Sequence, residues 1–121
     1  MALVAHDSKK SDLIRLAEAN LPLFARFHVV ATGTSGRLLS EELGLPVERM
    51  ASGPEGGDLQ IGALIAQGDV DALIFLRDPL TAHPHEPDIQ GLLRVCNVHN
   101  VPLATNLATA ELILRGLTAE A

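Results

Sequence analysis

The stretch Asp71-Ala72-Leu73-Ile74-Phe75-Leu76 decides the fold class of this chain. Its last five residues are all apolar, without the alternation of polar and apolar side chains found in a strand that has one exposed face. A strand of this composition is typical of a parallel sheet covered by helices on both faces. We therefore predict an α/β fold in which residues 71–76 form a strand that is buried on both sides.

The rest of the chain alternates between short apolar runs and segments of helical periodicity. We predict strands at residues 2–5, 27–31, 47–51, 71–76 and 101–105, and helices at residues 11–21, 35–43, 58–67, from Pro87 onward and 108–117. The 121 residues contain no linker, low-complexity tract or repeat, so we expect a single domain spanning residues 1–121. The expected architecture is a three-layer α/β/α fold with a five-stranded, mainly parallel sheet, similar to the Rossmann and flavodoxin-like folds.

Polar residues or glycines follow every predicted strand. They are His6 and Asp7, Thr32 to Ser35, Ser52 and Gly53 with Asp58 beyond them, Asp78, and Asn106. In open parallel sheets, ligands bind in the crevice beyond the carboxyl ends of the strands. One polar loop says little, because loops are generally polar, but five at the same edge predict a binding site there.

Composition limits the class of partner. The formal net charge is −6, and the chain has no Trp or Tyr and only three Phe, whereas nucleic-acid binding usually needs basic stripes and stacking aromatics. The longest apolar runs fall far short of the roughly 20 residues that cross a bilayer. The single cysteine, Cys96, forms no internal disulfide and fits a reducing compartment. We expect a cytoplasmic protein that binds neither nucleic acid nor membrane.

Two loops rich in small residues carry the strongest signal. Ser52-Gly53-Pro54-Glu55-Gly56-Gly57-Asp58 delivers one carboxylate to the start of an apolar helix, and Thr32-Gly33-Thr34-Ser35-Gly36 leads from a strand into another helix. Small residues allow backbone N–H groups to approach an anion, and a helix N-terminus adds partial positive charge. The second loop matches neither the Walker nor the dinucleotide pattern and is open to interpretation as a simple capping turn. Together the loops indicate chemistry on a small phosphorylated molecule.

The remaining candidates each have two interpretations. Residues 6–10, His-Asp-Ser-Lys-Lys, are either a capped helix start with solvated lysines or an anion-binding group. Asp58 either complements a helix dipole or acts as a base, and Asp78 is either a structural cap or a site member. Residues 83–88, His-Pro-His-Glu-Pro-Asp, invite a zinc interpretation, but no further His or Cys stands at a supporting spacing. We therefore predict no metal, and one histidine in acid–base or hydrogen-bonding work with Asp88 fixing its tautomer.

Taken in order, these motifs resemble methylglyoxal synthases. The matching segments are residues 2–7, 31–34, 52–58, 78–80, 84–85 and 102–106. The resemblance covers nearly the whole chain. It implies the fold of that family and a lyase activity, the conversion of dihydroxyacetone phosphate to methylglyoxal and inorganic phosphate in a bypass of glycolysis.

The resemblance also implies roles for individual residues. Asp58 would be the catalytic base, His85 would contact the carbonyl and hydroxyl end, and Asp78 and Asp88 would support the site. The substrate, chiefly its phosphate, would be bound by His6, Asp7, Lys10, Thr32, Gly33, Thr34, Ser35, Ser52 and Gly53. Arg94 matches a family arginine. Departures from the family pattern are Ser35, where threonine is common, and an end soon after Leu117, where many members have a longer tail.

Further implications concern partners. The family uses no metal or organic cofactor and is typically a homohexamer, and phosphate is both its product and a candidate effector. The same fold resembles the regulatory domain of carbamoyl phosphate synthetase, which would keep the phosphate cradle but has no need for Asp58 and His85. A plain structural domain would leave the glycine-rich loops and the five polar strand ends unexplained.

Overall fold

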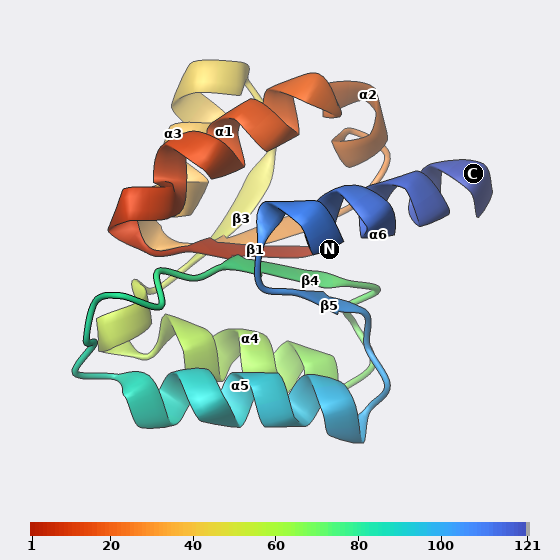
Figure 1. Cartoon of the computed structure of the whole chain (residues 1–121). Coiled ribbons are helices and arrows are strands. Elements are labelled where there is room, and N and C mark those ends of the chain that lie inside the picture. Colours follow the sequence, from red (N-terminus) through yellow and green to blue (C-terminus); the bar gives the residue numbers. More distant parts are fainter. Residues whose placement is uncertain (121) are drawn as a thin grey trace.

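The computed structural model describes residues 1–120, without the side chain of Glu120, and contains one five-stranded sheet between two layers of helices (Figure 1). The strands are β1 (Ala2–Ala5), β2 (Val29–Thr32), β3 (Val47–Met50), β4 (Leu73–Leu76) and β5 (Leu103–Ala104). They lie in the order β3-β2-β1-β4-β5, and every neighbouring pair is parallel. The predicted α/β class and five-stranded parallel sheet are confirmed.

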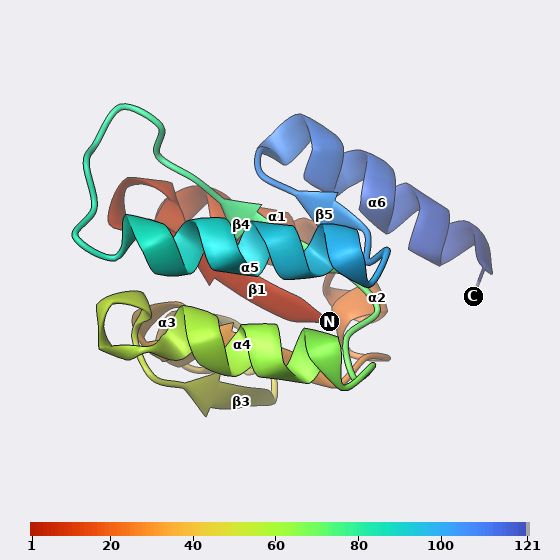
Figure 2. The ribbon, with the colours of Figure 1, turned by 90° about the horizontal axis from the view of Figure 1, so that it is seen from below.

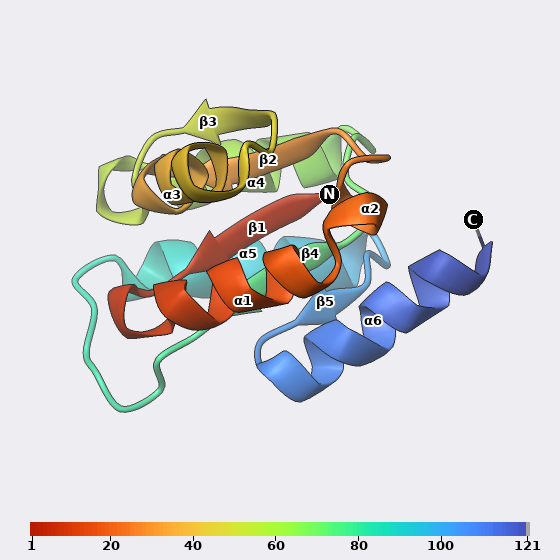
Figure 3. The ribbon, with the colours of Figure 1, turned by 90° about the horizontal axis from the view of Figure 1, so that it is seen from above.

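Helices cover both faces of the sheet. They are α1 (Lys10–Ala19), α2 (Leu21–Phe24), α3 (Gly33–Leu43), α4 (Gly57–Ala66), α5 (Glu86–Val98) and α6 (Leu107–Glu120), with the 3₁₀ turns η1 (Asp7–Lys9) and η2 (Gly53–Glu55). Figure 2 shows α4 and α5 together on one face, and Figure 3 shows α1, α3 and α6 on the other. No helix within residues 1–120 has the length and apolar character needed to cross a bilayer.

The inner strands supply apolar side chains to both layers. In β1, Leu3 and Ala5 pack toward α1 and α3, whereas Ala2 and Val4 pack toward α4 and α5. Alternate residues of β4 divide in the same way, and all four are at most 2% exposed. The unbroken apolar run at residues 72–76 is thus explained by two buried faces.

The strand order reverses direction between β1 and β4, which places a crevice at their carboxyl ends. The register pairs Ala5 with Leu76, so both strands end at the same level. The backbone N–H of His6 continues the ladder by donating to the carbonyl of Leu76 at 3.1 Å. The first residues beyond both strands are therefore held side by side.

Several predicted boundaries are wrong. The predicted helix 11–21 ends at Ala19, because a new short helix, α2, starts at Leu21 with Pro22 in its first turn. The predicted strand 27–31 begins only at Val29, since Phe27 packs against the core from the preceding loop. Apolar character marks burial here, whether or not the backbone is in a strand.

Chain packing is tightest at the start of α4. A Cβ atom placed on Gly57 would lie 1.9 Å from the carbonyl oxygen of Ala51, and the Gly57 N–H donates to the Ser52 carbonyl at 2.8 Å. Gly56, just before it, has a φ of 101°, which other residues rarely adopt. These two glycines allow the chain to turn sharply and bring Asp58 inside.

We predict that Gly57→Ala destabilises the fold by about 3 kcal/mol, since the backbone must shift to relieve the clash with Ala51. Gly91, in the interior of α5, has open space at its Cβ position and supplies the matched control. Gly91→Ala should stabilise the protein by about 0.5–1 kcal/mol through helix propensity. Urea denaturation measures both changes, and equal midpoints for the two variants would contradict the packing argument.

Candidate active site

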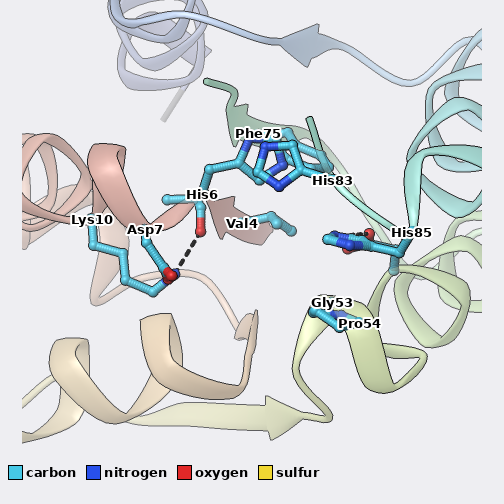
Figure 4. Close-up of a pocket in the computed structure, with 11 residues that line it drawn as sticks. Val4, His6, Asp7, Lys10, Gly53, Pro54, Phe75, His83 and His85 are labelled. Atoms are coloured by element: carbon cyan, nitrogen blue, oxygen red, sulfur yellow. Dashed lines mark hydrogen bonds and ion pairs between the residues drawn. The ribbon is translucent and has the colours of Figure 1, made fainter. Parts of the chain in front are cut away.

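A pocket of about 110 Å³ lies at the carboxyl ends of β1 and β4 (Figure 4). Its walls come from β1, η1 and the start of α1, from η2 and α4, and from β4 and the loop that follows it. The lining residues are Val4, Ala5, His6, Asp7, Lys10, Gly53, Pro54, Asp58, Phe75, His83 and His85. The predicted position of the site at this edge of the sheet therefore holds a real cavity.

Asp58 is the most unusual group in the pocket. Its side chain is fully buried in the first turn of α4, and neither carboxylate oxygen has a hydrogen-bond partner. Burial raises the pKa of Asp58 above its ordinary value, and His85 opposes that rise while Asp88 adds to it. A buried carboxylate without hydrogen-bond partners binds a proton more strongly than an exposed one, which suits it to act as a general base.

His85 and Gly53 enclose this carboxylate. Nε2 of His85 lies 3.6 Å from Oδ2 of Asp58, and the side chain of His85 is 10% exposed. A Cβ atom on Gly53 would lie 2.9 Å from Nε2 of His85 and 3.5 Å from Oδ1 of Asp58. A side chain at position 53 would thus occupy the space in which the carboxylate and the imidazole meet.

His6 presents one ring nitrogen to the pocket. Its Nδ1 accepts a hydrogen bond from the backbone N–H of Asp78 at 2.8 Å, so a neutral ring carries its proton on Nε2. That Nε2 is buried and has no partner. Burial, reinforced by His83, Arg77 and His85, lowers the pKa of His6 to about 4. His6 is therefore a neutral hydrogen-bond donor at neutral pH.

Lys10 supplies positive charge at the other side of the pocket. Its Nζ donates to the Ala5 carbonyl at 2.8 Å and pairs with Oδ1 of Asp7 at 3.0 Å. The side chain of Lys10 is only 17% exposed, whereas that of Asp7 is fully exposed. The hydrogen bond and charge of Lys10 hold the pKa of Asp7 below its usual value.

The Thr32–Ser35 loop lies next to the pocket without lining it. It forms the N-terminus of α3, whose first N–H groups have no partners inside the helix, and the hydroxyl of buried Ser35 has no hydrogen-bond partner. A Cβ atom on Gly33 would lie 3.1 Å from both N and Cα of Ser52. The next residue, Gly53, lies close to the Asp58 carboxylate. Ser52 and Gly53 therefore link the N-terminus of α3 to that carboxylate.

The structure thus brings six of the predicted site residues to the pocket wall and leaves the others around it. The six are His6, Asp7, Lys10, Gly53, Asp58 and His85. Thr32, Gly33, Thr34, Ser35 and Ser52 lie in the adjoining turns, and Asp78 and Asp88 lie outside the pocket lining. Arg94 is exposed on α5.

Of the two interpretations of Asp78, the hydrogen bonds to its side chain favour the structural cap. The carboxylate of Asp78 accepts hydrogen bonds from Ser8, Thr81 and the Leu80 N–H, which lower its pKa to about 2, so this side chain is a loop cap. The backbone N–H of Asp78 is what reaches His6. Asp88 does not fix the tautomer of His85, because the buried Nδ1 of His85 has no hydrogen-bond partner.

Sequence reasoning missed His83. Its ring stacks on His6 with centroids 3.7 Å apart, and Figure 4 shows these two rings together beside Phe75. The His-Pro-His spacing drew attention to this histidine as a candidate metal ligand or as one of two candidates for acid–base work, and not as a neighbour of His6. Within residues 1–120, no group of three or more His, Cys, Asp or Glu side chains is arranged to hold a metal ion.

We predict that Asp58→Asn raises the thermal midpoint at neutral pH, because an amide costs less to bury than an ionised carboxylate. The folded-state pKa is raised above 3.8, so ionisation destabilises the fold above that pKa and has no effect below the ordinary value. The gain should therefore shrink as the pH falls toward 4. Melting curves over pH, with exposed Asp69→Asn as the control, test this; a lower midpoint for Asp58→Asn would contradict it.

Comparison with known proteins identifies the family of this chain. The family model described as an MGS-like domain matches residues 12–105. The methylglyoxal synthase of Carboxydothermus hydrogenoformans is 58% identical over 117 residues, covering 97% of each chain. That of Thermus thermophilus is 56% identical over 114 residues, covering 94% of this chain and 90% of its own.

A solved structure is similar to this chain in both fold and sequence. The crystal structure of methylglyoxal synthase from Elizabethkingia anophelis superposes with a TM-score of 0.87 at 47% identity, over 93% of this chain and 74% of that chain. Sequence likeness over almost the full length, a shared fold and a pocket that holds an unpartnered carboxylate beside two imidazoles lead to one assignment. This chain belongs to the methylglyoxal synthase family.

Proposed function

We propose that this protein is a phosphate-eliminating lyase that converts dihydroxyacetone phosphate to methylglyoxal and inorganic phosphate. The observation that carries the proposal is the Asp58 carboxylate, which is buried without partners, 3.6 Å from an imidazole, in a pocket beside the N-terminus of α3. The near full-length relatives that are named methylglyoxal synthases support the same activity.

The reaction begins with proton abstraction by Asp58. The ionised carboxylate takes a proton from the hydroxymethyl carbon, and the electron pair moves to the carbonyl oxygen to give an ene-diolate. The raised pKa of Asp58 makes it a stronger base than an exposed aspartate. The absence of competing hydrogen bonds leaves both oxygens available to the substrate.

His6 and His85 stabilise the ene-diolate. The unpartnered Nε2–H of His6 would donate to the developing oxyanion. A neutral ring can do this because the hydrogen bond from the Asp78 N–H to Nδ1 leaves the ring proton on Nε2. Triosephosphate isomerase applies the same combination of carboxylate base and neutral imidazole to related substrates. His85 stands next to the base and would contact the hydroxyl end.

Phosphate is expelled in the second step. The terminal hydroxyl gives up its proton, which leaves with the phosphate, and its oxygen becomes the aldehyde oxygen. The carbon–carbon double bond shifts to the carbon that bears the phosphate, and the bond from that carbon to the phosphate oxygen breaks. The resulting enol tautomerises to methylglyoxal, so the substrate yields both products without water or an oxidant.

Elimination requires the breaking bond to stand out of the ene-diolate plane. Lys10, Ser52, Gly53 and the Thr32–Ser35 turn would hold the phosphate in that orientation through charge, hydroxyls and N–H groups. Lys10 already binds an anion, the fully exposed Asp7 carboxylate. A substrate phosphate can replace this partner at little cost, because Asp7 remains solvated when released.

The binding-module alternative explains the site less well. A regulatory domain of the carbamoyl phosphate synthetase type needs the anion-binding turns but gains nothing from an unpartnered buried carboxylate. Such a group lowers stability, so its presence argues for catalysis. In this proposal Asp78 acts through its backbone N–H, which holds His6, and Asp88 acts by raising the pKa of Asp58.

We also propose a cytoplasmic homohexamer with phosphate as product and candidate effector. Among the side chains that the structure describes, four large apolar ones are exposed, namely Leu59, Leu80, Val98 and Leu112, and Leu80 is 95% exposed in the loop after β4. Apolar exposure of this degree is consistent with burial between subunits.

We predict that Asp58→Asn lowers kcat by about 10² to 10⁴-fold, the usual contribution of a general base, while substrate binding changes little. The measurement is methylglyoxal formation from dihydroxyacetone phosphate, followed by derivatisation of the product. Asp69→Asn, which removes an exposed carboxylate outside the site, is the control and should match the wild type. Near wild-type turnover for Asp58→Asn would exclude Asp58 as the base.

The hexamer predicts a single species of six chain masses in sedimentation velocity. Leu80→Asp and Leu112→Asp each place a charge on an exposed apolar side chain and should shift the distribution to smaller species wherever that residue lies between subunits. A wild-type protein that sediments as a monomer at micromolar concentration would contradict the assembly.

A further inference from the structure

His83 lies in the loop between β4 and α5, and its ring packs against the site. The rings of His83 and His6 stack with an interplanar angle of 25° and centroids 3.7 Å apart. His83 also meets His85 edge-on, with centroids 5.6 Å apart at 71°. Its Nε2 is buried and has no hydrogen-bond partner, although the ring lines the pocket.

Three contacts then fix the ring of His6. The Asp78 N–H holds Nδ1, Phe75 packs edge-on with centroids 5.1 Å apart, and His83 covers one ring face. The first contact sets the tautomer, but one hydrogen bond leaves the ring free to tilt about it. The stacked ring of His83 limits that tilt and keeps water from this face of His6.

We propose that His83 is a positioning residue, whose stacked ring holds Nε2–H of His6 toward the oxygen of the substrate carbonyl. This inference rests on the proposed function for its catalytic consequence, but the geometry of His6 is independent of it. The sequence pattern pointed to His83 only together with His85, and its contact with His6 joins residues 77 positions apart.

The charges around the pair favour the same role. Burial is the main cause that lowers the pKa of His6; interactions with His83, Arg77 and His85 lower it further, and Asp78 opposes them. The carboxylates of Asp7 and Glu86 also interact with His83. Because the stacked ring of His83 contributes to the burial of His6, it helps to keep His6 neutral, and a neutral His6 carries its proton on Nε2.

Two substitutions separate stacking from direct chemistry. His83→Ala removes the stacked ring, whereas His83→Phe keeps a flat ring of similar position and removes both nitrogens. If His83 acts by stacking, the His83→Phe variant keeps most of the activity that the His83→Ala variant loses. If its Nε2 contacted the substrate directly, the two variants would lose activity to the same degree.

The test measures kcat and KM for dihydroxyacetone phosphate between about pH 5 and pH 9, with exposed His99→Ala as the control. His83→Ala should lower kcat by roughly 10- to 100-fold with little change in KM, because a displaced donor fails mainly in the transition state. His83→Phe should recover kcat to within about threefold of wild type, as expected where the ring packing is retained. The acid limb of the profile should move to higher pH in His83→Ala, where His6 is more exposed to solvent.

A second readout does not depend on turnover. Nitrogen-15 spectra of labelled histidine should show His6 as the single Nε2–H tautomer in wild type and His83→Phe, and with broadened or mixed signals in His83→Ala. Melting curves separate loss of ring order from loss of fold.

The outcomes are distinct. Wild-type kinetics and unchanged His6 signals in His83→Ala would overturn the positioning role, and so would equal losses in the alanine and phenylalanine variants. A wild-type protein that forms no methylglyoxal would overturn the proposed function alone, while the spectra would still decide whether His83 orders His6.

Discussion

The buried carboxylate of Asp58 is the constraint on which the rest of this structure depends. A buried ionised group with no hydrogen-bond partner destabilises the fold. The backbone can place Asp58 inside the protein only through a tight turn that requires Gly56 and Gly57. Gly53 then leaves open the space between the carboxylate and His85. The whole Ser52–Asp58 segment is explained by the need to bury one carboxylate and still leave it open to the pocket, which is the arrangement that the proposed base requires.

The parallel sheet supplies the other half of the site. Because β1 and β4 end at the same level, His6 and the loop after β4 meet without a long connection. The neighbouring strand β2 delivers the N-terminus of α3 to the Ser52 turn. One edge of the sheet thus brings together a buried carboxylate, two imidazoles and the N-terminus of a helix, which belong to four separate segments of the sequence.

Sequence reasoning reached the fold and the centre of the site for identifiable reasons. The apolar run at residues 72–76 indicated a strand covered by helices on both faces. The three glycines before Asp58 indicated a loop in which the backbone packs closely. It failed where the cause was a contact between distant residues. The hydrogen bond from Ser8 to the Asp78 carboxylate and the stacking of His83 on His6 both join positions far apart in the chain. The predicted end of the first helix, near Asn20, and the predicted start of the second strand, at Phe27, were wrong. In both places apolar residues remain buried beyond the end of the helix or strand.

The hydrogen bond from the Asp78 N–H to His6 has a consequence for how this site tolerates genetic change. The donor is a main-chain amide, so it survives replacement of Asp78 by any residue except proline. The protonation pattern of a key imidazole is therefore encoded in the path of the polypeptide and not in a second side chain. Mutational drift at position 78 can alter the loop while leaving the tautomer of His6 intact.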